Sequence, residues 1–251
     1  MSTNGVVFYK GLSQFDKKPI VGIAVGLSAK SHNIKTGSLI QTYILVDNGV
    51  MPHENAAYGK ADSTVCGNCP HRAGPNEKSG SCYVNLGQGP YAIYTQYLKG
   101  KYPSLAQSHK SLFTDRFLRL GSYGDPTAIP FDIWLNITSW AKDHTGYTHQ
   151  WRLCDQRFKT LCMASCDSTL DYDTAKYMGW RTFRVKTPEQ VTLKGEIKCP
   201  ASPDSFPKRQ CEDCMACNGI NRENDQRRDI VINAHGLKWR IEKFRKVISL
   251  L

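Results

Sequence analysis

The sequence contains no long apolar run, and this absence argues against a membrane-spanning protein. None of its 251 residues belongs to an apolar stretch that approaches the roughly 20 residues needed to cross a bilayer. The first 19 residues also lack the basic and then apolar layout of a secretory signal peptide. We therefore expect no membrane contact and a location in a reducing cytoplasm. In that compartment, closely spaced cysteines indicate metal or redox sites before disulfides.

Three common catalytic signatures are missing as well. The chain has no Gly-Lys-Ser/Thr phosphate loop, no nucleophile elbow and no recognisable pair of catalytic carboxylates. Acidic residues are scarce relative to basic ones, with 22 Asp and Glu against 33 Lys and Arg, which gives a formal net charge of +11. This excess favours DNA, RNA or another acidic partner, although a solvated basic surface has the same composition.

Cysteine, in contrast, is abundant, with ten residues in the chain. Since 40% of the residues are apolar, a chain of this length can build a core without disulfides, so the cysteines need another explanation. Seven of them fall in the segments 66–82 and 199–217. The first cysteine group comprises Cys66, Cys69 and Cys82, and the second comprises Cys199, Cys211, Cys214 and Cys217. We expect the other three, Cys154, Cys162 and Cys166, to be small core residues, with a role as a fourth metal ligand as the alternative for any of them.

The spacing of the second cysteine group predicts a metal centre. Cys211, Cys214 and Cys217 form a Cys-x2-Cys-x2-Cys run, which resembles iron–sulfur ligation more than the separated pairs of a zinc ribbon. Cys199, which precedes a proline, would supply a remote fourth thiolate. An iron–sulfur cluster is therefore our first interpretation, and zinc bound by four thiolates is the alternative.

The first cysteine group offers three ligands and no obvious fourth. Three thiolates that leave one coordination position open suit a catalytic [4Fe-4S] cluster that binds a small molecule. They equally suit a structural zinc ion whose fourth ligand is His71. The sequence leaves both alternatives open.

Strand-like segments that alternate with helical ones predict an α/β fold. We count about six or seven such strands, which favours a partial (incomplete) parallel β/α barrel over a doubly wound open sheet. We divide the chain into N-terminal strands at 1–37, a barrel-like domain at 38–236 and a basic C-terminal helix at 237–251. Functional groups in such folds gather at the carboxyl ends of the strands, so we expect both cysteine groups to meet on that rim.

Other polar residues are candidates for binding. His149 and Arg152 in YTHQWR could contact an anionic substrate or a cofactor carboxylate. They lie three apart on a strand-like segment and face opposite sides, so we expect at most one to point inward. His235 ends the last expected strand and is a further candidate on the same rim.

The segment LRLGSYGDPTAIPFDIW resembles the second-strand signature of radical SAM enzymes. The resemblance implies that Gly124 and Asp125 lie in the turn that holds the amino group of S-adenosylmethionine. It also implies a [4Fe-4S] cluster on the first cysteine group and an auxiliary cluster on the second. The chain departs from that superfamily in two ways: it has Cys-x2-Cys-x12-Cys where Cys-x3-Cys-x2-Cys is usual, and Asp where Glu is usual.

Over residues 36–236 the chain also resembles an uncharacterised family of bacteriophage and mobile-element proteins. The shared motifs are VCGNCPHR followed by SCYV, then RLGSYGDP, YTHQWR, GWRTFRV and VINAHG. This resemblance implies expression in a host bacterial cytoplasm and brings no activity with it. We therefore expect an iron–sulfur, radical-SAM-like enzyme with an unknown substrate that could be a nucleic acid. The alternative is a zinc-binding, non-enzymatic DNA- or RNA-binding protein of phage replication or host takeover.

Overall fold

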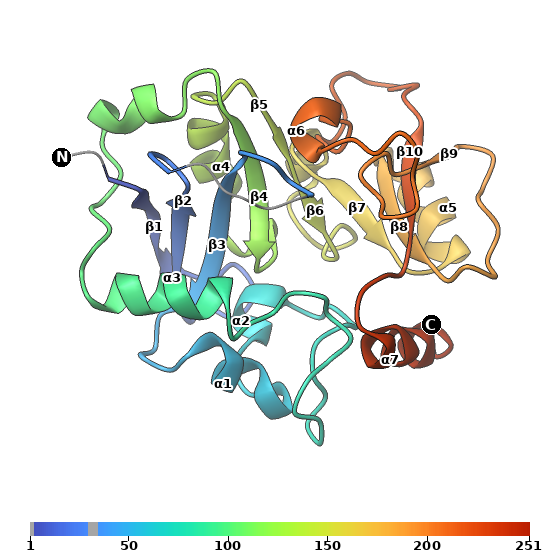
Figure 1. The fold of residues 1–251 in the computed structure, drawn as a ribbon, viewed down its shortest axis with the longest axis horizontal. Helices are drawn as coiled ribbons and strands as arrows, with labels where there is room; N and C mark the ends of the chain where they lie inside the picture. Colours follow the sequence, from blue (N-terminus) through green and yellow to red (C-terminus); the bar gives the residue numbers. More distant parts are fainter. Residues whose placement is uncertain (1–2, 30–34) are drawn as a thin grey trace.

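The computed structural model describes residues 3–29 and 35–251, and its strands form two five-stranded sheets (Figure 1). The first sheet has the order β1 (Gly5–Leu12), β2 (Pro19–Val25), β3 (Ile40–Val46), β4 (Phe117–Tyr123) and β5 (Asp143–Thr145). The second has the order β6 (Tyr147–Thr148), β7 (Met163–Cys166), β8 (Thr182–Lys186), β10 (Asp229–Asn233) and β9 (Glu196–Lys198).

Strand direction divides the first sheet in two. β1, β2 and β3 pair antiparallel, whereas β3, β4 and β5 pair parallel. Every pair in the second sheet is parallel. The prediction of an α/β fold is therefore confirmed. The strands at the N-terminus join the first sheet through β2 and β3, and among the described residues the sheets do not close into a barrel.

A single glycine links the two sheets, because Gly146 is the only residue between β5 and β6. Its carbonyl accepts a hydrogen bond from Met163 N at 2.9 Å, at the start of β7. A Cβ atom at this position would lie 2.8 Å from Cys162 Sγ and 2.9 Å from Leu161 O, so no larger residue fits. The close approach explains why a glycine stands where one sheet passes into the other.

The helices fill the connections between strands. They are α1 (Pro52–Ala56), α2 (Ser63–Cys66), α3 (Gly89–Leu98), α4 (Phe131–Thr138), α5 (Thr169–Tyr177), α6 (Cys211–Cys214) and α7 (Lys238–Ile248). Short 3₁₀ turns are η1 (Ala57–Gly59), η2 (Gln107–Leu112), η3 (Pro126–Ala128) and η4 (Gln156–Thr160). No helix within the described residues has both the length and the apolar character needed to cross a membrane.

Local sequence fixes where these helices begin. At α5 the Ser168 side chain accepts a hydrogen bond from Asp171 N at 3.1 Å, and the Asp171 carboxylate accepts one from Ser168 N at 3.2 Å. This reciprocal capping box satisfies two backbone N–H groups that the helix leaves free. In the main hydrophobic core, Trp134 packs on Phe8 with ring centroids 5.0 Å apart and donates its indole N–H to Pro126 O.

Two of the three remaining cysteines behave as predicted. Cys162 and Cys166 have no exposed surface and belong to the main core, which confirms that they are small buried residues. Cys154 is half-buried and packs against that core. All ten cysteines are free thiols.

Candidate functional site

One cavity of about 250 Å³ lies against the same face of both sheets. Successive side chains of a strand point to opposite faces, and part of the lining alternates accordingly, while residues 121–125 and 165–167 line the cavity as continuous runs. From β4 the lining residues include Arg119, Gly121 and Tyr123, and along β5 and β6 they are Thr145, Tyr147 and His149. The alternation thus passes through Gly146 without a break. Side chains from β7, β8 and β10 complete the wall.

All seven cysteines of the two groups line this one cavity. Cys82 and Cys199 are more than a hundred residues apart in the sequence, so only the fold brings the two groups together. The shared cavity agrees with the expectation that both groups belong to one site.

The two groups nevertheless differ in where they meet the strands. The first group follows the carboxyl ends: Asp125 N, just beyond β4, donates to Val65 O at 2.7 Å. In the second group Cys199 directly follows the carboxyl end of β9, as expected, whereas Cys217 lies at the start of β6, where Gly146 N donates to Cys217 O at 3.0 Å. Our expectation that the whole second group lies on the carboxyl rim is therefore wrong for Cys217.

The topology explains this difference. β9 and β10 are parallel neighbours, so the chain that leaves the carboxyl end of β9 must return to the amino end of β10. Residues 199–228 form that return connection, and they carry the second cysteine group back along the cavity. Sequence periodicity revealed the strands but not the order in which they pair.

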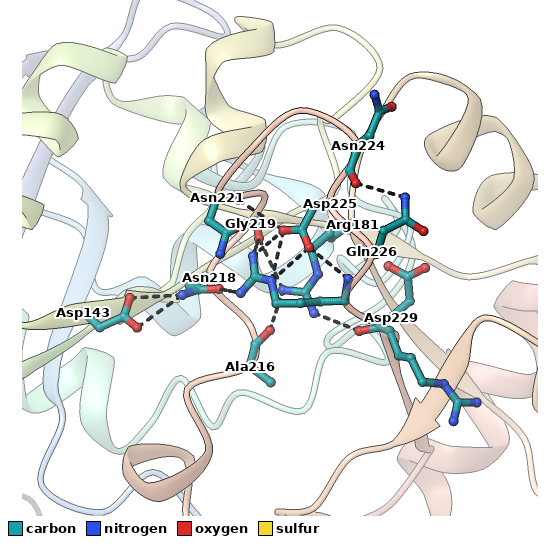
Figure 2. Close-up of polar contacts among 12 residues, drawn as sticks. Asp143, Arg181, Ala216, Asn218, Gly219, Asn221, Asn224, Asp225, Gln226 and Asp229 are labelled. Atoms are coloured by element: carbon teal, nitrogen blue, oxygen red, sulfur yellow. Dashed lines mark hydrogen bonds and ion pairs between the residues drawn. The ribbon is translucent and has the colours of Figure 1, made fainter.

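Figure 2 shows how the return connection is held at Ala216, Asn218 and Gly219, the residues around position 217. Arg181, at the start of β8, donates to Ala216 O at 2.7 Å and to Gly219 O at 3.3 Å. Asn218 donates to both carboxylate oxygens of Asp143 on β5 at 3.2 Å. The residues on each side of Cys217 are thus tied to both sheets.

The spacing of the thiols bears on which metal they could hold. Among the described residues, no three cysteine sulfurs lie within 4.8 Å of one another. Four thiolates around zinc would lie about 4 Å apart, since the Zn–S bond is about 2.3 Å. The described thiols therefore do not form a set of ligands gathered tightly enough for a single zinc ion.

Burial favours the protonated form of four of these thiols by raising the pKa of Cys66, Cys199, Cys211 and Cys217. It raises the pKa of Cys66 well above its usual value, and the nearby Cys69 thiol raises it further. Burial likewise raises the pKa of Cys217 to about 12, opposed in part by a hydrogen bond from Tyr147. A bound cation would reverse this preference, because metal coordination deprotonates a thiol outright.

Beside the first group, His71, His149 and Asp167 form the one set of described residues whose ligand atoms lie within 4.8 Å of one another. Asp167 contacts His71 Nε2 at 2.9 Å and His149 Nε2 at 3.3 Å. His71 Nδ1 lies 2.7 Å from Ser81 Oγ. Burial lowers the pKa of His149, but Cys69 and Asp167 more than offset that effect and leave it raised.

Sequence reasoning identified both histidines as candidates and missed Asp167. No motif marks this aspartate, which follows an apolar strand in MASCD. Its position directly after the carboxyl end of β7 is the one signal that could have revealed it.

Asp125 lies at the cavity wall as expected, and its carboxylate is fully engaged by the protein. Its oxygens accept hydrogen bonds from the Thr127 amide at 3.0 Å and hydroxyl at 2.8 Å, from the Thr148 hydroxyl at 2.8 Å and from His149 N at 2.9 Å. Asp125 therefore ties the turn after β4 to the end of β6. Binding of an amino group by Asp125 stays a prediction.

The neighbouring Gly124 also lines the cavity and meets a steric need. Its φ is +82°, and a Cβ atom would lie 2.6 Å from Ile44 Cβ, so a side chain fits neither the backbone conformation nor the space. This packing lets β4 and the turn lie close to β3.

The last two candidates differ in position. Arg152 does not line the cavity: it pairs with Asp171 at 2.5 Å, and its guanidinium lies 3.9 Å from the centre of the Trp151 ring. His235 does line the cavity, and its Nδ1 lies 2.8 Å from Asn233 O. Of the pair in YTHQWR, His149 alone points inward.

Comparison with known proteins identifies no relative from which a function could be transferred. No protein-family model, no curated protein and no solved structure matches this chain.

Proposed function

We propose that this protein is an iron–sulfur enzyme of the radical-SAM-like kind, with a cluster at each end of one cavity. The observation that carries the proposal is that seven cysteines from two distant segments line that cavity together. Ten free thiols and the reducing cytoplasm that we expect for this chain agree with metal ligation rather than disulfides.

The two cysteine groups would have different roles. Cys66, Cys69 and Cys82 would hold a cluster with one open position, since the fourth thiol near that end, Cys166, points toward Ala164 O at 3.6 Å. The four cysteines of the second group would complete a closed cluster. When bound, a reduced [4Fe-4S] cluster supplies the electron for reductive cleavage of S-adenosylmethionine. Asp125 would hold the turn after β4 at the cavity wall beside these cysteines.

We further propose that the two sheets together form an incomplete β/α barrel around this cavity. The unbroken alternation of inward residues across Gly146 supports one continuous curved wall. The first cysteine group, with His149 and Asp167, then occupies the carboxyl-terminal face, where α/β barrels place their reactive groups.

Metal analysis of protein purified without oxygen tests the proposal. We expect brown protein with about eight irons and a matching amount of sulfide per chain, because two clusters hold four irons each. Replacing Cys66, Cys69 and Cys82 with serine should remove about half of the iron, and replacing Cys211, Cys214 and Cys217 the other half. Cys154→Ser, outside the cavity, serves as control. Colourless protein with stoichiometric zinc would refute the proposal and favour the nucleic-acid-binding alternative.

A second candidate is a single metal ion held by His71, His149 and Asp167, because their ligand atoms alone among the described residues are gathered within 4.8 Å. Two histidines and one carboxylate suit iron(II) or zinc. Under this alternative, Asp167→Asn abolishes metal binding while the two triple cysteine variants keep it. The cluster proposal gives the opposite pattern.

A further inference from the structure

Arg119 differs from the other well-buried arginines of the described chain because only one of its guanidinium nitrogens donates a hydrogen bond. Arg184 forms two hydrogen bonds to the Glu196 carboxylate at 2.7 and 2.6 Å. Arg72 donates to the Asp62 carboxylate at 2.6 Å, and Arg181 donates to three backbone carbonyls. Arg119, only 9% exposed, has no carboxylate within 4.0 Å in the described residues.

The guanidinium of Arg119 faces the cavity. Its Nη2 donates to the Tyr83 hydroxyl at 2.8 Å, and its Cζ lies 5.7 Å from the centre of the Tyr147 ring. The other guanidinium nitrogens make no hydrogen bond to the part of the chain that the structure describes. These nitrogens keep some accessible surface, since no atom of Arg119 belongs to the described side-chain atoms that are both fully buried and without a partner.

The carboxylates of the cavity are committed elsewhere. Asp125 is bonded to Thr127, Thr148 and the His149 amide, and Asp167 is bonded to the two histidines. Asp125 and Asp167 are the acidic residues that line the cavity in the described chain. Neither is therefore a counter-ion for Arg119. Burial lowers the pKa of Arg119, and the groups whose deprotonated forms raise it are Tyr83, Tyr147, Cys211 and Cys217.

A second arginine meets the same tyrosine from the other side. Arg240 of α7 lines the cavity and donates Nη1 to Tyr83 O at 2.6 Å, while its Nε is buried without a partner. Tyr83 thus links a guanidinium from β4 to one from α7.

A largely buried guanidinium with unpaired N–H groups is costly, and its planar fork matches the two oxygens of a carboxylate or phosphate. We infer that Arg119 binds an oxyanion, a carboxylate or phosphate group, of the molecule on which this protein acts. Tyr83 follows Cys82, and Tyr147 contacts Cys217, so the anion would be held between the two cysteine groups. The inference rests on the proposed function only in taking this cavity as the substrate site.

Calorimetric titration of the purified protein with inorganic phosphate, and separately with succinate, tests the inference. We expect binding to the unmodified chain and at least about tenfold weaker binding to Arg119→Gln, because a charge-assisted hydrogen-bond pair is lost. Arg119→Lys keeps the charge and loses the fork, and should also bind more weakly. Of the two probes, the tighter one identifies the kind of oxyanion. Arg245 lies on α7, pairs with Glu189 at 2.7 Å and does not line the cavity. Arg245→Gln removes one positive charge there and should bind the probes like the unmodified chain.

The outcomes are separable. Equal affinity of the unmodified chain and Arg119→Gln, or no binding of either probe to the unmodified chain, overturns the inference. Iron lost from Arg119→Gln with phosphate affinity retained would also overturn it, since Arg119 would then be the partner of the metal-bound thiolates. If circular dichroism shows that Arg119→Gln does not fold, the affinities of Arg119→Lys and Arg245→Gln for the probes are compared instead. Weaker binding by Arg119→Lys supports the inference, and equal binding overturns it. Absence of iron from the unmodified chain refutes the proposed function. The phosphate affinities of the unmodified chain and Arg119→Gln can still be compared in that case.

Discussion

At the residue scale, buried polar groups at the cavity wall are held by partners that come from different strands. Asp125 is the clearest example, since its donors lie in the turn after β4 and at the end of β6. Burial raises the pKa of this carboxylate, while the hydrogen bonds from Thr127 and Thr148 lower it. The residue that the sequence suggested for ligand binding therefore also has a structural role.

We predict that Asp125→Asn destabilises the protein by about 1–3 kcal/mol. The carboxylate accepts hydrogen bonds on both oxygens, and an amide would place an NH2 group, itself a donor, against one set of these donors. Urea unfolding measures the change. Asp132→Asn is the matched control, since its side chain is 72% exposed. Coincident unfolding curves for Asp125→Asn and the unmodified chain would contradict this structural role.

At the element scale, the segments that enclose the cavity are held by few contacts. α7 buries one residue, Phe244, whose ring stacks on His71 with centroids 5.2 Å apart. Its other contacts are polar and mostly exposed, such as Lys243 to Glu77 at 3.1 Å. Figure 1 shows α7 connected to β10 by an extended segment and lying outside both sheets. Arg240, Ile241 and Phe244 of this helix line the cavity.

We predict that Phe244→Ala releases α7 from the cavity, since burial of a phenylalanine stabilises by about 2 kcal/mol. Hydrogen exchange of the amides of 238–248 should become faster, while exchange in β7 and β8 stays unchanged. Trp239→Ala, at a residue that is 43% exposed, should leave the rates as they are. Equal protection of α7 in Phe244→Ala and the unmodified chain would show that the polar contacts alone hold the helix.

The return connection between β9 and β10 depends on a different kind of contact. Arg227 donates to the Asp225 carboxylate at 2.6 Å, to Asn218 Oδ1 at 2.7 Å and to Gly219 O at 2.7 Å. The hydrogen bond from Arg227 holds the pKa of Asp225 well below the usual range of a carboxyl group. This ion pair therefore organises the loop directly after Cys217.

We predict that Asp225→Asn lowers stability by about 1 kcal/mol at neutral pH, as expected for a partly exposed ion pair. A carboxyl with a lowered pKa stabilises the fold above its ordinary pKa and loses that contribution as the pH falls toward the lowered value. The difference between the two proteins should thus be present at pH 7 and shrink below about pH 4. Unfolding midpoints across this range measure it, and a difference that grows in acid would contradict the assignment.

At the scale of the whole molecule, one cavity collects residues from nearly the entire chain. Sequence reasoning correctly identified the α/β class. The seven cysteines that it selected as metal ligands line the cavity, and their binding of metal stays a prediction. Sequence reasoning did not find Asp167, which lacks a motif, or the position of Cys217 at the start of β6. Both depend on strand pairing, which local patterns do not specify.

We predict that removing bound metal lowers the thermal unfolding midpoint by at least about 4 °C, because a ligand that binds only the folded chain stabilises it. Calorimetry of oxygen-free protein before and after treatment with a chelator and oxidant measures the shift. A protein in which both triple cysteine variants are combined should show no shift. An unchanged midpoint in the unmodified chain would argue that the thiols hold no metal.

Gly146 has a consequence for how this architecture could change. Because a single residue joins β5 to β6, side chains on both sheets keep a common phase, and residues 145, 147 and 149 all face inward. Inserting one residue at the junction would exchange the inner and outer faces of β6 and turn His149 away from its neighbours, whereas inserting two would restore the phase. Odd and even changes in length at this point would therefore have opposite effects on the site.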